Sequence, residues 1–83
     1  MTYRLVLPEE ATKVLAMMDE ATHDLFILAA LDLPNDPHGL GNLLNAEGPF
    51  SRRALALADI GFIVYVVDES RRTVTVSTFI WVG

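Results

Sequence analysis

The chain has 83 residues, no cysteine and a formal net charge of −5, with six Lys and Arg residues against eleven Asp and Glu residues. This length suits one small domain, expected here over residues 1–83, and the lack of cysteine excludes disulfides, thiolate metal sites and a cysteine nucleophile. An acidic chain with so few cations is a poor general binder of nucleic acid, because affinity for phosphate comes largely from clustered Lys and Arg.

The N-terminal segment predicts a soluble protein that begins with a strand and a helix. No apolar stretch approaches the ~20 residues that a membrane helix needs, so we expect a cytoplasmic protein without a membrane partner. Residues 2–7 alternate loosely between apolar and polar side chains, which suits a short strand ended by Pro8. Pro8 followed by two glutamates favours a helix start, since the helix dipole attracts anions there. This helix is expected to end near Asp19.

A second helix is expected after Asp19 or Thr22, either of which can cap it, and Pro34 ends it. Its apolar residues cover most of its circumference, so one side should pack on a sheet and another on the first helix. Two interpretations stay open. The helix is simply central in a small core, or part of its surface, including Leu25 and Phe26, is exposed for a binding partner.

Residues 34–49 are rich in Pro, Gly and Asn and predict a long loop. Loops of this length are usually either functional or mobile. Leu40, Leu43 and Leu44 are expected to hold the loop against the body of the domain.

The last third of the chain predicts three consecutive antiparallel strands. Gly61 separates the first strand, from Phe50, from the second, and a polar hairpin turn over residues 68–72 separates the second from the third, over residues 73–81. β-branched and aromatic residues crowd the last two strands. With the preceding elements the order is β-α-α-β-β-β. We therefore expect an α+β fold in which an antiparallel sheet carries a helical hairpin packed on one face.

Because side chains alternate between the two faces of a strand, the sequence predicts which of them the helices cover. Leu55 and Leu57 should face the helices, which leaves Arg52 with small alanines on the opposite, open face. The same rule divides the last strand into two sets. The core set is Val74, Val76 and Ile80, and the open-face set is Thr73, Thr75, Ser77, Phe79 and Trp81.

Phe79 and Trp81 would thus form an aromatic pair at the end of the open face. Aromatic side chains are common anchors of protein interfaces, so we expect this pair to bind a partner and Trp81 to be partly exposed or covered by that partner. The alternative is that Trp81 packs over residues 34–49 as part of the core.

The sequence contains no nucleophile elbow, phosphate loop, dinucleotide fingerprint or paired Cys and His metal ligands. No cofactor and no metal is expected. His23 lies in a helix start and His38 in the loop, and nothing in the sequence places them near each other or near a carboxylate with the spacing of metal ligands, so both are expected to be solvent-facing structural residues. Asp68 and Glu69 are adjacent carboxylates that suit a solvated turn.

The arginines are the remaining candidates for contacts with phosphate. Arg52 and Arg53 lie in a strand among alanines and leucines. Either the arginine stem covers apolar neighbours and the head pairs with a carboxylate such as Asp59, or the head contacts phosphate on the open face. Arg53 is near the start of the strand, where its head can reach solvent. Arg71 and Arg72 close the last hairpin, where they form a soluble strand end or contact phosphate or an acidic segment of a partner.

Several segments resemble the RelE/ParE superfamily of bacterial toxins. The resemblance covers nearly the whole chain and is carried by YRLVLPEEA at residues 3–11, LPNDP at 33–37, GPFSRRAL at 48–55, FIVYVVDE at 62–69 and TVTV at 73–76. It implies a small cytoplasmic toxin, either a ribosome-dependent mRNA endoribonuclease or a gyrase inhibitor, neutralised by an antitoxin whose helix and strand wrap it. RelE-like members are expected to cleave RNA with basic residues and a tyrosine on the open face.

The catalytic set of that family is largely missing from this sequence. Where the family usually carries an arginine before its Val-Leu-Tyr run, the chain has GFI at residues 61–63, and the family's closing His-Arg pair and terminal tyrosine have no counterpart. Of the family's basic positions, those matching Arg52 and Arg53 remain. We therefore expect a diverged RelE/ParE-like protein that acts by binding an antitoxin, the ribosome or gyrase.

Two other functions stay open. In the first, the chain is an active ribosome-dependent mRNA endoribonuclease in which Arg52 contacts the phosphate, supported by Arg53 or Lys13. In the second, the chain is a homo-oligomeric interaction module without toxicity, joined through exposed edge strands and the patch of Phe79 and Trp81.

Overall fold

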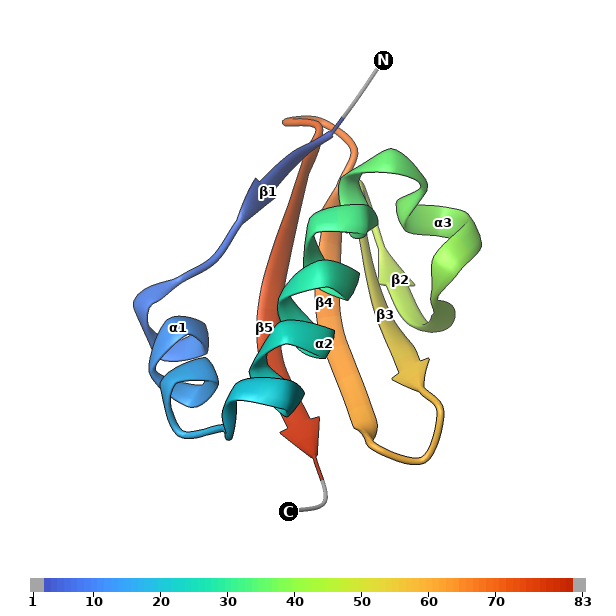
Figure 1. The fold of residues 1–83 in the computed structure, drawn as a ribbon. Helices are drawn as coiled ribbons and strands as arrows, with labels where there is room; N and C mark the ends of the chain where they lie inside the picture. The colour runs from blue at the N-terminus through green and yellow to red at the C-terminus, as the bar shows by residue number, and fades with distance from the viewer. Residues whose placement is uncertain (1–2, 82–83) are drawn as a thin grey trace.

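A computed structural model describes residues 3–81, in which a five-stranded sheet carries its helices on one face (Figure 1). The strands lie in the order β1-β5-β4-β3-β2, with β1 parallel to β5 and all other neighbours antiparallel. The α+β prediction is confirmed, although the sheet is mixed and has one more strand than expected. In chain order the elements are β1 (Arg4–Val6), α1 (Glu9–Ala16), α2 (Glu20–Asp32), the 3-10 turn η1 (Leu33–Asn35), α3 (Pro37–Leu40), β2 (Asn42–Glu47), β3 (Phe50–Leu57), β4 (Gly61–Asp68) and β5 (Thr73–Trp81).

The two longer helices begin where the sequence signals indicate. Pro8 precedes α1, and Glu9 and Glu10 fill its first turn, where the helix dipole favours anions. Asp19 rather than Thr22 caps α2: its carboxylate accepts a hydrogen bond from the Thr22 N–H at 3.4 Å, and the hydrogen bonds from Thr22 lower the pKa of Asp19. The connection between the two helices is therefore short, and together they form the expected hairpin.

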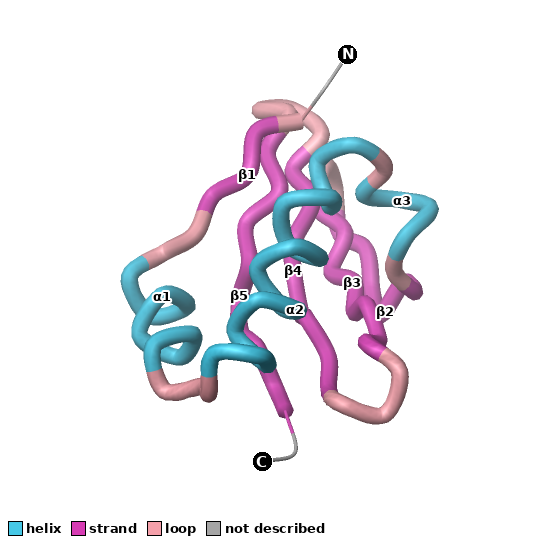
Figure 2. Tube along the Cα trace, in the orientation of Figure 1, coloured by secondary structure: helices cyan, strands magenta, loops and turns pink. Residues whose placement is uncertain are grey.

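Residues 34–49 do not form the predicted long loop but contain two further elements (Figure 2). The Asp36 carboxylate accepts a hydrogen bond from the Gly39 N–H at 3.1 Å and starts α3, with Pro37 in its first turn. β2 then pairs with β3 in an antiparallel hairpin, whose turn holds Gly48 at a φ of +58°. All six residues of β2 are exposed, so no buried face marks this strand in the sequence.

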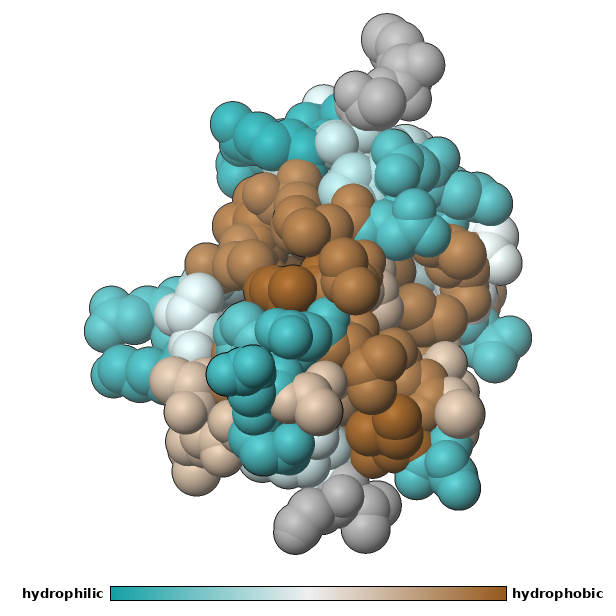
Figure 3. Space-filling model, in the orientation of Figure 1, coloured by the Kyte–Doolittle hydropathy of each residue, from teal (hydrophilic) through white to brown (hydrophobic). Residues whose placement is uncertain are grey.

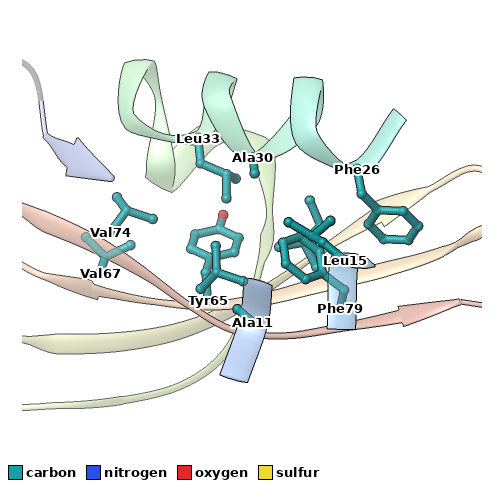
Figure 4. Packing of buried hydrophobic residues seen from close by; sticks show 11 residues of the cluster. Ala11, Leu15, Phe26, Ala30, Leu33, Tyr65, Val67, Val74 and Phe79 are labelled. Carbon is teal, nitrogen blue, oxygen red and sulfur yellow. The ribbon is translucent and has the colours of Figure 1, made fainter. Parts of the chain in front are cut away.

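The core lies between the sheet and the helices (Figure 4). Phe26 of α2 meets Phe79 of β5 edge to face, with 5.6 Å between the ring centroids. Tyr65 is fully buried, and its hydroxyl donates a hydrogen bond to the Pro37 carbonyl at 2.7 Å, which satisfies a polar group that burial would otherwise leave unpaired. The buried members of the core are Ala11, Leu15, Phe26, Ala30, Leu33, Ile63, Tyr65, Val67, Val74, Val76 and Phe79.

A bulge in β5 reverses the alternation of its last residues. Val64 of β4 pairs with Thr78 whereas the next residue, Tyr65, pairs with Val76, so Ser77 is an extra residue in β5. Val74 and Val76, before the bulge, face the helices as predicted. After the bulge the prediction is wrong. Phe79 is buried in the core and Trp81 packs against it, whereas Ile80, assigned to the core from the sequence, is exposed.

Candidate binding face of the sheet

The helices leave one face of the sheet uncovered, and in Figure 1 this open face points away from the viewer. Its composition follows from the strand register. One cross-strand row consists of Ala56, Phe62 and Ile80, the next of Ala54, Val64 and Thr78, and a third of Arg52, Val66 and Thr75. Phe62 and Ile80 are 49% and 51% exposed. The open face is therefore apolar toward the β3–β4 turn and carries its charge toward the opposite end.

Arg52 lies on this face, as the alternation predicts. It is exposed, and it pairs with Val66 of β4 and with Asn45 of β2 in the sheet register. Within residues 3–81, its guanidinium makes no ion pair and no side-chain hydrogen bond, so the expected pairing with Asp59 does not form. At the far edge of the face, Arg4 of β1 lies beside Thr73. Arg52 is therefore the charged side chain on the inner strands of this face that is available to bind a ligand.

Arg53 occupies the opposite, helix-covered face. Its Nη1 donates a hydrogen bond to the His38 carbonyl at 3.1 Å and lies 3.5 Å from the Gly41 carbonyl, while its Nε donates to Ser51 Oγ at 3.3 Å. The expectation of a carboxylate partner for Arg53 is wrong, because its partners are backbone carbonyls and a hydroxyl. Arg53 therefore holds α3 against β3, and it cannot join Arg52 on one phosphate.

The other predicted cations are also apart from Arg52. Lys13 lies on α1, 3.4 Å from Glu9 Oε1 and largely exposed, so it belongs to the helical side. Arg71 is exposed in the β4–β5 turn, with its Nε 3.9 Å from Asp68 Oδ2. Arg72, at a φ of +53°, places its guanidinium 5.6 Å from the centre of the Tyr3 ring. The candidates for a joint phosphate site are thus spread over the strand, the turn and the helical layer.

Asp68 fixes the turn that carries Arg71. Its Oδ1 accepts hydrogen bonds from the Ser70 hydroxyl at 2.7 Å, the Ser70 N–H at 3.0 Å and the Arg71 N–H at 3.3 Å. The Ser70 hydroxyl bond is the main cause of the lowered pKa of Asp68, because these donors favour the ionised carboxylate. Asp68 is thus a structural residue of the turn rather than the solvated carboxylate that the sequence suggested.

A cluster of titratable side chains that the sequence did not reveal lies at the same end of the molecule. The Tyr3 hydroxyl donates to Glu69 Oε1 at 2.7 Å, and the His38 ring N–H at Nε2 donates to Glu69 Oε2 at 2.6 Å. The bond from Tyr3, followed by that from His38, lowers the pKa of Glu69, and the same carboxylate raises the pKa of Tyr3. His38 faces solvent, as expected, but its contact with the Glu69 carboxylate was not predicted. No signal in the sequence links Glu69 with His38, which is 31 positions away, or with Tyr3, which is 66 positions away.

This cluster connects the residue before β1, α3 and the β4–β5 turn. The side chains of His38 and Glu69 are 44% and 43% exposed, and within residues 3–81 no pocket lies beside them that could hold a substrate. Among the described residues no group of three His, Cys, Asp or Glu side chains is placed to hold a metal ion. The arrangement is that of a surface clasp between three segments distant in the sequence.

The four residues predicted to bind a partner divide between core and surface. Phe26 and Phe79 are 0% and 3% exposed and contact each other in the core, so they offer no surface in this structure. Trp81 is partly exposed, as predicted, but it lies on the helix side of the sheet and packs against the core. Leu25 is exposed on α2.

Among the described helices, none is long and apolar enough to span a membrane.

Comparison with solved structures identifies the fold. A chain of the archaeal RelE-RelB complex from Pyrococcus horikoshii OT3 superposes with a TM-score of 0.84 at 20% identity, over 100% of this chain and 98% of that chain. A chain of the toxin-antitoxin complex RelBE2 from Mycobacterium tuberculosis gives a TM-score of 0.84 at 17% identity, covering 99% and 100%. The isolated E. coli RelE toxin gives 0.75 at 17% identity, covering 98% and 85%. Neither a protein-family model nor a curated protein sequence matches the chain.

These likenesses define the class: the chain has a RelE-like toxin fold, with a mixed five-stranded sheet and its helices on one side. The resemblance seen in the sequence is confirmed at the level of the fold. The chemistry of the open face is a separate matter, since one fold can present different side chains on an uncovered sheet.

Proposed function

We propose that this protein is the toxin-fold member of a toxin–antitoxin module and that it acts by binding a macromolecule rather than by cleaving RNA. The observation that carries the proposal is the composition of the open face. Of the described residues that β3, β4 and β5 direct to this face, Arg52 is the only cation, and most of the others are alanine, valine, threonine, phenylalanine or isoleucine.

RNA cleavage needs more than one guanidinium. Attack of a ribose hydroxyl on the adjacent phosphate requires a base, an acid and positive groups that stabilise the charge developing on the phosphate. Each such donor typically contributes ~3 kcal/mol or more to stabilising the transition state. Arg53 is on the other side of the sheet and Lys13 on the helical layer, so neither supports Arg52. A phosphate bound beside Arg52 would therefore meet one positive group, since Arg4 lies at the far edge of the sheet.

An open face that is apolar at one end and cationic at the other suits a protein surface with exposed apolar side chains and a nearby carboxylate. The similar structure from M. tuberculosis is a toxin-antitoxin complex and that from P. horikoshii is a RelE-RelB complex, which supports an antitoxin as one partner. The ribosome and gyrase are the candidate targets, and the cytoplasm is the compartment where all of these partners meet.

The test is a cleavage assay with purified protein, ribosomes and mRNA, in which an active ribosome-dependent mRNA endoribonuclease serves as the positive control. We expect no cleavage above background by this protein. Codon-specific cleavage that is lost in Arg52→Ala, at an unchanged melting temperature, would overturn the proposal and establish the endoribonuclease. The binding arm is co-expression with the product of a reading frame adjoining the gene. A complex that Phe62→Gln weakens would support the open face as a binding surface.

A second function, self-association, is favoured by β2. This strand lies at the end of the sheet, and Leu43 and Leu44 are 54% and 55% exposed. A long exposed edge strand with apolar side chains is a template for pairing with another chain. Light scattering tests this candidate directly, because a strict monomer across a hundredfold range of concentration would contradict it.

A further inference from the structure

The outer side of α2 carries a row of leucines that the core does not use. Leu25, Leu28 and Leu31 follow one another at a spacing of three residues and are 45%, 66% and 58% exposed. The core takes the other side of the same helix, with Phe26 and Ala30. Three-residue spacing places the row along one side of a helix over about 9 Å, which is nearly two turns. Figure 3 shows apolar side chains gathered on this helix-covered side of the molecule.

The surroundings of this leucine row are acidic. Asp24 lies next to Leu25 in the chain and Asp32 next to Leu31, and both aspartates are exposed. Residues 9–36, which contain α1 and α2, carry seven Asp and Glu residues and a single cation, Lys13. All five arginines of the chain lie outside this segment. The layer formed by α1 and α2 is therefore strongly negative, and Arg53, which also lies on the helix-covered face, is bonded to the backbone of α3 rather than to this layer.

This charge excludes several occupants of the leucine row. Nucleic acid and anionic lipid carry negative charge and would be repelled from an acidic layer. A second copy of the chain docking through the same row would bring two acidic layers together, because a two-fold symmetric contact sets the same surface patch of both copies face to face. The remaining kind of partner that matches exposed leucines in an acidic layer is a protein segment with an apolar stripe flanked by positive charge.

We propose that the row of Leu25, Leu28 and Leu31 is a docking surface for an amphipathic helix whose apolar stripe is flanked by Lys or Arg, carried by a partner protein. The leucines supply the apolar contact and the aspartates select the charge of the partner. This surface lies on the opposite side of the sheet from the open face. It goes beyond the function proposed above and stands whether or not the open face binds a toxin target.

The probes are three 18-residue helical peptides with one shared leucine stripe, flanked by lysine, glutamine or glutamate. Each peptide is titrated against the full chain by fluorescence anisotropy at 50 mM and 300 mM salt. We expect the lysine peptide to bind about tenfold more tightly than the glutamate peptide at low salt, with the glutamine peptide between them and the difference reduced at high salt.

Three double variants make the test specific to the row. L28Q/L31Q should weaken the lysine peptide about tenfold, because both exposed leucines lose their apolar contact. D24N/D32N should mainly reduce the preference for lysine over glutamate. F62Q/I80Q, a matched control with similarly exposed apolar residues on the open face, should leave binding unchanged. Circular dichroism checks the fold of each variant.

Any of three results would overturn the proposal: no saturable binding of the lysine peptide, equal binding of the glutamate peptide, or an equal loss in F62Q/I80Q and L28Q/L31Q. These outcomes are independent of the RNA cleavage assay. That assay reports on Arg52 and the open face, so failure of one proposal is distinguishable from failure of the other.

Discussion

Replacing Arg53 by alanine should destabilise the protein, whereas the same change at its neighbour Arg52 should not. The Arg53 guanidinium donates to the His38 carbonyl and to Ser51 Oγ, at 3.1 Å and 3.3 Å, and approaches the Gly41 carbonyl. A hydrogen bond from a charged group typically contributes ~1.5–3 kcal/mol. Because the main bond of Arg53 is partly accessible to water, we reduce this to about 1–2 kcal/mol in the free energy of unfolding.

Arg52 makes no such contact among the described residues, so Arg52→Ala should change the free energy of unfolding by less than ~0.5 kcal/mol. Urea unfolding followed by circular dichroism measures both. A change of 1 kcal/mol shifts the melting temperature of a domain of this size by ~4–8 °C, which makes the difference easy to see. Arg53→Met separates the guanidinium from its stem, since methionine keeps most of the apolar contact.

Equal effects of the two alanine variants, within ~0.5 kcal/mol, would refute the assignment of Arg53 to the helix-covered face. The comparison also bears on any activity assay. A loss of function in the double variant R52A/R53A would have two causes that the assay cannot separate: removal of an exposed cation, and loss of the hydrogen bonds by which Arg53 holds α3 against β3. Only the single variant Arg52→Ala reports on the open face.

Three further predictions concern the core, the clasp and the turns. Phe79→Ala should lower the free energy of unfolding by ~3–5 kcal/mol, because it empties a buried site against Phe26, while Ile80→Ala should cost less than ~1 kcal/mol; similar values in urea unfolding would contradict the bulge in β5. Tyr3→Phe should raise the pKa of Glu69 toward its ordinary value, as measured by NMR of the Glu69 carboxyl carbon, since the Tyr3 hydroxyl is the main cause of the lowered pKa. A lowered carboxyl pKa contributes stability above the unfolded-state pKa that is lost as pH falls through the folded-state pKa, so this variant should lose less stability between about pH 6 and pH 2. Gly61→Ala should be strongly destabilising because the added methyl group would collide with the Ile80 carbonyl, whereas Gly48→Ala, with open space but a φ of +58°, should cost only ~1 kcal/mol; comparable melting temperatures for the two variants would contradict the close approach at Gly61.

The elements that could be predicted from the sequence are those whose pattern is local. Asp19 caps α2 through a contact three residues away, and the alternation of Leu55 and Leu57 with Arg52 gives the correct faces of β3. β2 could not be predicted in this way. It is stabilised by backbone pairing with β3 and buries no side chain, so its residues show neither alternation nor β-branched enrichment.

The misassigned end of β5 has a different cause. One extra residue, Ser77, shifts the alternation by one position and moves Phe79 to the core and Ile80 to the open face. A bulge of this kind depends on how β4 and β5 pair, and the composition of β5 alone does not indicate it. The clasp between Tyr3, His38 and Glu69 is likewise a product of the tertiary fold, because its members come from three separate elements.

The two faces of a single sheet explain how one fold can carry different side chains at a site. Side chains such as Tyr65 and Val76 on the helix-covered face pack in the core, and their volume and polarity are constrained by their neighbours. Exposed residues of the open face, such as Arg52, Phe62 and Ile80, are less constrained by the rest of the chain. Arg52 and Arg53 show the consequence within one dipeptide. Arg52 is available to a ligand, whereas Arg53 stabilises the fold. A count of basic residues in this dipeptide therefore assigns two cations to a face that carries one of them.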